Sequence, residues 1–281
     1  MLHTIKSYGI IATNPIAEQF NGGYQMLKDF TKCVFDIIVQ AGQSNAEGYG
    51  FGSVSDPWKP SDRVWYLNGN FTIVPAAEEV TGNEIQSNFA LSFAREYMTN
   101  GYLAEGRNLL ILRTAVGGTG FLDNNWKPAD ALCLRMMEMI RTALSLNPEN
   151  RLAAFLWHQG ETDASLNASY DVHYQHLMTL FRSVSDEFGV PDLPFIAGDF
   201  VHHWKNDNIA ICTPVVDAIR DVCRDLGHGA FVETDGLLSN YQELHRDPLG
   251  WFDPIHFSRI AIYELGRRYF AAFTALKGGI I

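Results

Sequence analysis

The chain has 281 residues, of which 47% are hydrophobic and 19% are charged. This balance is typical of a globular protein and excludes a disordered one. The formal net charge is −11, and the sequence contains no cluster of lysine and arginine. The charge argues against nucleic acid and anionic membrane surfaces as partners. A small or neutral substrate fits it better, and the sequence gives no indication of the oligomeric state.

Residues 1–32 show no clear periodicity, and we predict an N-terminal extension packed on a single domain of residues 33–281. The apolar stretch Ile10-Ile11-Ala12 is too short for a signal peptide. No stretch approaches the roughly 18 apolar residues of a membrane span. We therefore expect a cytoplasmic protein, although a secreted protein whose signal had been removed would show the same pattern. Four widely spaced cysteines leave both disulfides and free thiols open.

Strands and helices are expected to alternate along the domain. Apolar runs predict six strands, at residues 35–40, 63–67, 108–114, 152–157, 195–200 and 229–234. Apolar side chains at helical spacing predict five helices, at residues 86–99, 129–146, 169–187, 214–226 and 258–275. Near-continuous apolar strands are typical of parallel strands covered on both faces. The pattern predicts an α/β fold with a three-layer, doubly wound, flavodoxin-like sheet that is mostly parallel.

Polar side chains follow several of the predicted strands at the point where each strand ends. In a doubly wound sheet the carboxyl ends of the strands meet at one edge, where functional sites form. The polar residues in question are Gln43, Ser44, Asn45, Thr119, His158, Gln159, Glu161, Asp199, His202, His203 and Asp235, and Thr119 stands in the loop Gly117-Gly118-Thr119-Gly120. Folding alone does not require this composition, so we expect the functional site at this edge.

Ser44 is the candidate nucleophile, because it follows an apolar strand and a sharp turn at Gly42. An α/β hydrolase keeps its nucleophilic serine in such a place. Asp253 and His256 provide an acid and a base three residues apart, close enough to meet across one turn. The alternatives are that Ser44 only caps a helix and that Asp253 is a cap before a surface histidine.

Gly117-Gly118 can bring a backbone N–H close to a developing oxyanion, and the Gln159 amide can donate to the same atom. A glycine turn and a structural hydrogen bond are the alternatives for these residues. A divalent cation suits another set of side chains: His158, Glu161, Asp163, Asp199, His202 and His203. Their spacing matches no established metal motif, so we expect no metal.

Four motifs occur in the order found in a known group of enzymes: Gly42-Gln43-Ser44-Asn45, Gly117-Gly118-Thr119, His158-Gln159-Gly160-Glu161-Thr162-Asp163, and Asp253 with His256. With these motifs, residues 35–270 resemble the sialate O-acetylesterase domain of the SGNH hydrolase superfamily. That group includes the acetyl xylan esterases of carbohydrate esterase family 6. The Gly-Gln-Ser-Asn block together with His-Gln-Gly-Glu is the specific part of the resemblance.

The resemblance implies that Ser44 is the nucleophile, that His256 is the general base and then the acid, and that Asp253 orients His256. It also implies an oxyanion hole made of the Ser44 and Gly118 backbone N–H groups and the Gln159 side chain, which replaces the superfamily's usual asparagine. Glu161 is a second carboxylate that can support His256 or the Gln159 loop. The resemblance implies no metal and no organic cofactor.

The expected function is therefore that of a carbohydrate O-acetylesterase that works through an acetyl-serine. Its substrate is a small acetylated sugar, either acetylated xylo-oligosaccharides or O-acetyl sialic acid. A general short-chain acyl esterase and a non-catalytic sugar-binding domain are the alternatives. The candidate substrate contacts are Asn45, beside the nucleophile, and Asn124, Asn125 and Trp126, which follow the glycine-rich loop.

Overall fold

The computed structural model describes residues 28–246, 248, 250 and 252–278. Residues 1–27 of the predicted extension therefore lie outside the described residues. Its remaining part contains a short 3-10 helix at Phe30–Lys32. The Phe30 ring lies edge-on against Trp65, with ring centroids 4.9 Å apart. The division into an extension and one domain stays a prediction.

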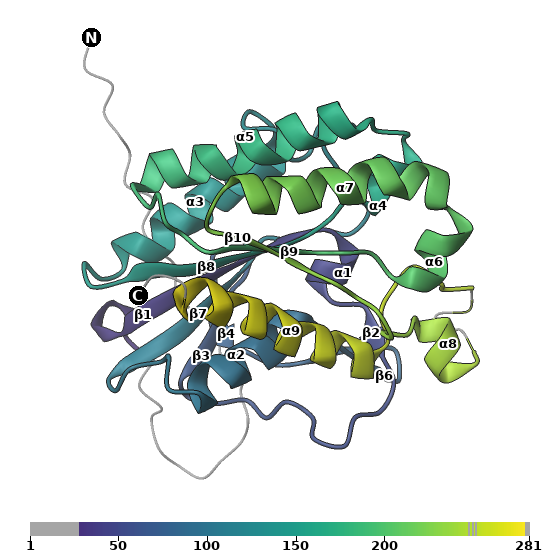
Figure 1. The fold of residues 1–281 in the computed structure, drawn as a ribbon. Coiled ribbons are helices and arrows are strands. Elements are labelled where there is room, and N and C mark those ends of the chain that lie inside the picture. Colours follow the sequence, from purple (N-terminus) through teal and green to yellow (C-terminus); the bar gives the residue numbers. More distant parts are fainter. Residues whose placement is uncertain (1–27, 247, 249, 251, 279–281) are drawn as a thin grey trace.

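A seven-stranded sheet lies between two layers of helices (Figure 1). In spatial order its strands are β10 (Gly229–Val232), β9 (Phe195–Gly198), β8 (Arg151–His158), β1 (Val34–Gly42), β7 (Arg107–Arg113), β3 (Val64–Leu67) and β4 (Ile73–Pro75). Only β4 runs antiparallel to its neighbour. A small antiparallel sheet contains β2 (Gly50–Phe51), β6 (Glu84–Ser87) and β5 (Glu79–Thr81). The predicted three-layer, mostly parallel fold class is confirmed.

Helices cover both faces of the sheet (Figure 1). One layer contains α3 (Ala131–Ser145), α4 (Glu161–Ser165), α5 (Tyr170–Phe188) and α7 (Ile209–Asp225), and the other contains α2 (Phe89–Thr99) and α9 (Arg259–Gly278). Side chains of β1 alternate between the two cores, with Ile37 and Val39 in the first and Ile38 in the second. The short helices are α1 (Ser44–Glu47), α6 (His202–Asp207) and α8 (Asn240–Leu244). Within the described residues, no helix is long and apolar enough to cross a bilayer.

All six predicted strands and all five predicted helices are present, with shifted ends. The predicted helix 86–99 is wrong at its start, because β6 extends through Ser87 and the helix begins at Phe89. The Asn88 side chain accepts the Ala90 N–H at 3.1 Å and so caps that helix. The predicted helix 214–226 begins five residues earlier, at Ile209, and passes through Pro214. Its buried residues on both sides of the proline explain why the helix continues there.

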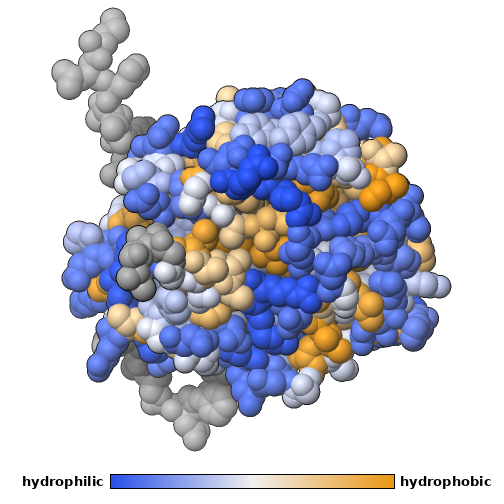
Figure 2. Space-filling model, viewed as in Figure 1, coloured by the Kyte–Doolittle hydropathy of each residue, from blue (hydrophilic) through white to orange (hydrophobic). Residues whose placement is uncertain are grey.

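Figure 2 shows the molecule from the same side as Figure 1. Hydrophilic residues cover most of this side, and hydrophobic residues gather in the middle of the view between α7 and α9.

The edge strand β10 is partly open to solvent. The Arg220 guanidinium lies 4.2 Å from the centroid of the Phe231 ring of β10 and pairs with Glu233. Charged groups beside an edge strand discourage the addition of a further strand.

Strand β1 marks the point where the sheet order reverses, because the chain forms β3 and β7 on one side of it and β8, β9 and β10 on the other. Sites in such sheets form at the carboxyl end of the strand at that point. Gly42 ends β1 with a φ of +126°, and a Cβ there would lie 2.1 Å from the His158 carbonyl oxygen. Only glycine fits this turn, which places Ser44 at the carboxyl edge.

Candidate active site

The structure brings Ser44, His256 and Asp253 together. Ser44 Oγ lies 2.9 Å from His256 Nε2, although the two residues are 212 positions apart. His256 Nδ1 lies 2.9 Å from Asp253 Oδ1, which also accepts the His256 backbone N–H at 3.2 Å. With the Nδ1–H held by the carboxylate, Nε2 is left to accept the Ser44 proton. Ser44 and Asp253 are buried, whereas the His256 side chain is 16% exposed.

Asn240 of α8 and Tyr49 support this group, and neither was predicted. Asn240 Nδ2 donates to Asp253 Oδ2 at 2.8 Å and to the Tyr49 carbonyl at 2.7 Å. The Tyr49 ring stacks on His256, with ring centroids 5.0 Å apart. Burial raises the pKa of Asp253, but the hydrogen bonds from His256 and Asn240 outweigh it and lower that pKa. Asp253 is therefore held ionised beside the histidine.

Two backbone N–H groups beside the nucleophile are available to an oxyanion. Within the described residues, the N–H groups of Ser44 and Gly118 have no hydrogen-bond acceptor. The Gly117 N–H instead donates to Glu47 Oε2 at 2.7 Å. A Cβ on Gly117 would lie 3.5 Å from the Ser44 Cβ, so the glycine loop lies against the nucleophile. The geometry therefore favours Gly118 over Gly117 as the second donor.

Gln159, the predicted third donor, is engaged elsewhere. Its Nε2 donates to Asp163 Oδ2 at 2.8 Å and to the Thr119 carbonyl at 3.3 Å, and the residue is fully buried. An amide nitrogen has two protons, and both are used in these bonds. The structure thus contradicts the oxyanion role predicted for Gln159 and supports the alternative of a structural hydrogen bond.

Asn45 was predicted to contact substrate, and the structure corrects this, because Asn45 is 1% exposed. Its Nδ2 donates to Glu161 Oε1 at 2.8 Å and to the Ile255 carbonyl at 3.0 Å, and its Oδ1 accepts the Phe257 N–H at 3.1 Å. These bonds fix the loop on both sides of His256. Within the described residues Glu161 has no hydrogen bond to His256 itself, so its predicted support of the histidine would act through Asn45. Burial raises the pKa of Glu161, and the hydrogen bond from Asn45 opposes this shift.

Trp126 was also predicted to contact substrate, and it is fully buried instead. Its Nε1 donates to Thr119 Oγ1 at 2.9 Å, and its ring lies edge-on to Trp157, with centroids 5.3 Å apart. The core therefore holds this side chain away from any ligand. Asn124 is exposed and Asn125 is partly exposed, so these two remain predicted substrate contacts.

The histidines and carboxylates considered for a metal belong to separate clusters. His158 is buried, and its Nδ1 lies 2.9 Å from the Tyr269 hydroxyl. Burial lowers the pKa of His158 to about 3. His202 Nε2 lies 3.4 Å from Asp199 Oδ2, and Asp199 also pairs with Lys205. In the part of the chain that the structure describes, no three metal-ligating side chains form a group.

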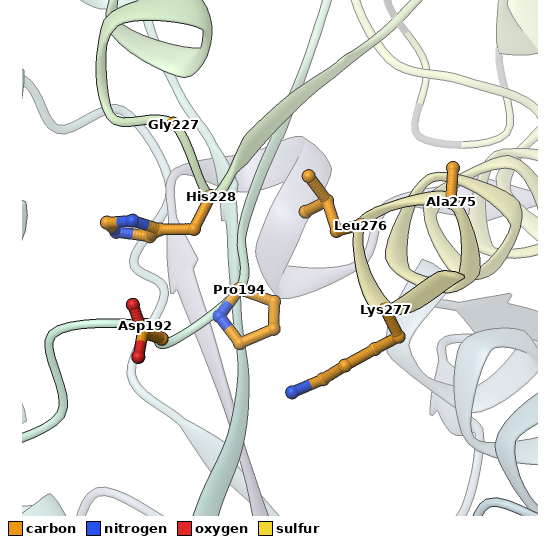
Figure 3. Close-up of a pocket in the computed structure, with 7 residues that line it drawn as sticks. All are labelled: Asp192, Pro194, Gly227, His228, Ala275, Leu276 and Lys277. Atoms are coloured by element: carbon orange, nitrogen blue, oxygen red, sulfur yellow. The ribbon is translucent and has the colours of Figure 1, made fainter. Parts of the chain in front are cut away.

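Figure 3 shows the side chains that line a pocket in the structure. Pro194 directly precedes β9 and His228 directly precedes β10, so the pocket lies at the amino ends of these strands. The other lining residues are Asp192, Gly227, Ala275, Leu276 and Lys277. The pocket is therefore separate from the edge that carries Ser44.

A serine, a histidine and a carboxylate that are hydrogen-bonded in succession, beside free backbone N–H groups, define a serine hydrolase. The doubly wound sheet presents this group at the edge where such folds place their chemistry. A family model described as carbohydrate esterase, sialic acid-specific acetylesterase matches residues 34–275. The chain belongs to this family of carbohydrate esterases.

Individual relatives are more distant. The chain is 23% identical over 213 residues to a probable 9-O-acetyl-N-acetylneuraminic acid deacetylase of Escherichia coli K12, a match that covers 61% of this chain and 65% of the relative's length. The crystal structure of NanS is similar with a TM-score of 0.74 and 19% identity, over 88% of this chain and 98% of that one. A carbohydrate acetylesterase from Xanthomonas citri gives a TM-score of 0.50 and 16% identity, over 87% and 56% of the two chains. At these identities the structural matches support the fold.

Proposed function

We propose that this protein is a serine esterase that removes O-acetyl groups from sialic acid. The observation that carries the proposal is the hydrogen-bonded succession of Ser44, His256 and Asp253, with both side-chain contacts at 2.9 Å. The family model and the Escherichia coli relative are both named for sialic acid, which supports this sugar over xylan as the substrate.

The reaction follows from the positions of these atoms. Ser44 Oγ attacks the acetyl carbonyl carbon while His256 Nε2 takes the serine proton. The Ser44 and Gly118 N–H groups stabilise the negative carbonyl oxygen of the tetrahedral intermediate. The bond to the sugar oxygen then breaks, and His256 gives its proton to that oxygen, which leaves as a hydroxyl. Water attacks the acetyl-serine in the same way, and acetate and free Ser44 result.

Acetate release from 9-O-acetyl-N-acetylneuraminic acid and from acetylated xylo-oligosaccharides tests the proposal. We expect turnover of the sialic acid ester and a loss of at least about 10⁴-fold in kcat for Ser44→Ala. Ser92→Ala is the matched control, because Ser92 is an equally buried serine, located in α2. Its turnover should equal that of the wild type.

Each other result changes the proposal in a defined way. Release from xylo-oligosaccharides alone would replace sialic acid by xylan fragments as the substrate. Equal turnover of p-nitrophenyl acetate and butyrate, without preference for a sugar ester, would indicate a general short-chain esterase. A folded protein that releases acetate from none of these substrates would exclude the esterase function.

A further inference from the structure

One buried carboxylate supports the loop that carries the Gly118 N–H. We call residues 117–122 the oxyanion loop. Asp163 Oδ1 accepts the Phe121 N–H at 3.0 Å and the Leu122 N–H at 2.9 Å. Asp163 Oδ2 accepts the Gln159 amide at 2.8 Å. Asp163 comes from α4, so it joins the polypeptide that follows β8 to the loop that follows β7.

The contact between this carboxylate and the loop is close. Asp163 is fully buried, and a Cβ on Gly120 would lie 2.7 Å from Asp163 Oδ1. The loop backbone therefore lies directly on the carboxylate, with no room for a side chain between them. His173 of α5 places its Nδ1 3.4 Å from Oδ2. Burial raises the pKa of Asp163, but the nearby His173 ring and the hydrogen bonds from the Leu122 and Phe121 N–H groups outweigh it and lower that pKa.

The rest of the oxyanion loop is fixed by other bonds. Gln159 Nε2 holds the Thr119 carbonyl, and Trp126 Nε1 holds Thr119 Oγ1. Glu47 holds the Gly117 N–H from the side of the nucleophile. The loop is therefore bonded before and after Gly118, whose own N–H has no acceptor within the described residues.

We propose that Asp163 is a positioning residue for oxyanion binding, which acts by holding the oxyanion loop so that the Gly118 N–H is directed at the substrate carbonyl oxygen. Gln159 acts with Asp163 in holding the loop and does not itself donate to the oxyanion. Preorganised donors stabilise the developing charge because they need no reorganisation during the reaction. This inference rests on the proposed esterase function.

The test uses Asp163→Asn, which keeps the side-chain shape but replaces one acceptor oxygen by a donor nitrogen. We expect kcat for p-nitrophenyl acetate to fall about 10²-fold, the loss typical of one oxyanion donor, with KM changed less than about twofold. The affinity for methylboronic acid, whose boron binds Ser44 Oγ as a tetrahedral anion, should fall by a similar factor. Partial misfolding alone would lower the active fraction and leave this affinity unchanged.

Asp199→Asn is the matched control. Asp199 is also a buried carboxylate at the carboxyl edge, and it pairs with Lys205 and His202 rather than with the oxyanion loop. This variant should lose stability but keep the boronate affinity of the wild type. Equal loss of boronate affinity in both variants, or an unchanged affinity in Asp163→Asn, would overturn the inference. Absence of turnover in the wild type would instead refute the esterase function.

If Asp163→Asn does not fold, hydrogen exchange of the wild-type protein tests whether Asp163 holds the oxyanion loop. Hydrogen exchange at the Phe121 and Leu122 amides should be slowed strongly, because Asp163 accepts both protons in a buried place. Exchange at the rate of an open loop would show that the carboxylate does not hold these amides, and the inference would fail.

Discussion

At the residue scale, the position of His256, the proposed general base, depends on the buried side chains of Asn45 and Glu161. Asn45 links the helix that begins with Ser44 to both peptide groups that flank His256. Glu161 Oε1 accepts a hydrogen bond from Asn45 Nδ2 and so holds the Asn45 side chain in this position. The distance between nucleophile and base is therefore set by an amide and a buried carboxylate as well as by the backbone.

Asn45→Ala should lower both stability and kcat. The change leaves the buried Glu161 carboxylate and two backbone groups without partners, at a cost of about 1–3 kcal/mol for each unsatisfied group. We expect the free energy of unfolding to fall by about 3 kcal/mol. We also expect kcat per folded molecule to be lower than in the wild type. Urea denaturation and acetate release measure the two effects.

Asn88→Ala is the control for this prediction, since Asn88 is equally buried but caps α2 and bonds Tyr66. It should lose stability and keep the kcat of the folded enzyme. If both variants kept their kcat per folded molecule, Asn45 would have no part in positioning His256.

His158 should make the protein sensitive to acid. Burial lowers the pKa of His158 from 6.5 to about 3, so between these values the unfolded chain binds a proton that the folded protein does not. Stability therefore rises with pH across this window and falls on acidification, by up to about 1.4 kcal/mol per pH unit. Urea denaturation between pH 4 and 7 should show a flatter pH dependence for His158→Gln than for the wild type.

At the scale of elements, β1 has different functions at its two ends. Ser44 follows its carboxyl end, and Asp36 lies near its amino end, fully buried. Asp36 Oδ1 pairs with Arg107 and Arg151, each at 2.7 Å. With about 3.3 Å per residue, roughly 20 Å separates Asp36 from Gly42, the last residue of β1, and Ser44 lies beyond the turn at Gly42.

Asp36→Ala should therefore affect stability without affecting the chemistry. Removing one partner of a buried ion pair lowers the free energy of unfolding by about 3–5 kcal/mol. We expect the lower value, about 3 kcal/mol, because the Arg151 side chain is partly exposed and water can solvate its charge in the variant. The kcat per active site, from titration of Ser44 with an organophosphate, should equal the wild-type value. A lower kcat per titrated site would contradict the separation of the two ends.

The sequence predicted the elements whose pattern is local. Long apolar strands and helices were found, whereas β2, β4, β5, β6, α1, α4, α6 and α8 were missed, because two to six residues are too few to show a period. Motifs also indicated Ser44, His256 and Asp253. Asn240 and the role of Asp163 depend on contacts between distant segments, which no spacing reveals.

Errors at the site have a common physical cause. A tryptophan after a glycine-rich loop has the same local pattern whether it meets a sugar or the core, and Trp126 meets the core. Gln159 can donate in two directions, and only the tertiary position of Asp163 decides between them. Burial and the direction of a side chain are set by packing rather than by neighbours in sequence.

At the scale of the whole molecule, the net charge of −11 should influence substrate association. Sialic acid carries a carboxylate, so the protein's field opposes its approach, and salt screens that field. We expect kcat/KM for 9-O-acetyl-N-acetylneuraminic acid to rise a few fold as ionic strength increases from about 10 to 200 mM. The value for uncharged p-nitrophenyl acetate should stay constant. A decrease with salt for the sialic acid ester would show that the site itself has a positive field.

The four cysteines are free, and their placement has a practical consequence. Cys133, Cys212 and Cys223 are buried, and Cys33 alone is partly exposed. Cys33 directly precedes β1 at the amino end, whereas Ser44 follows the carboxyl end. A maleimide linker at Cys33 would therefore tether the enzyme to a bead with its catalytic edge directed at the solution. Oriented immobilisation is thus available with the native sequence.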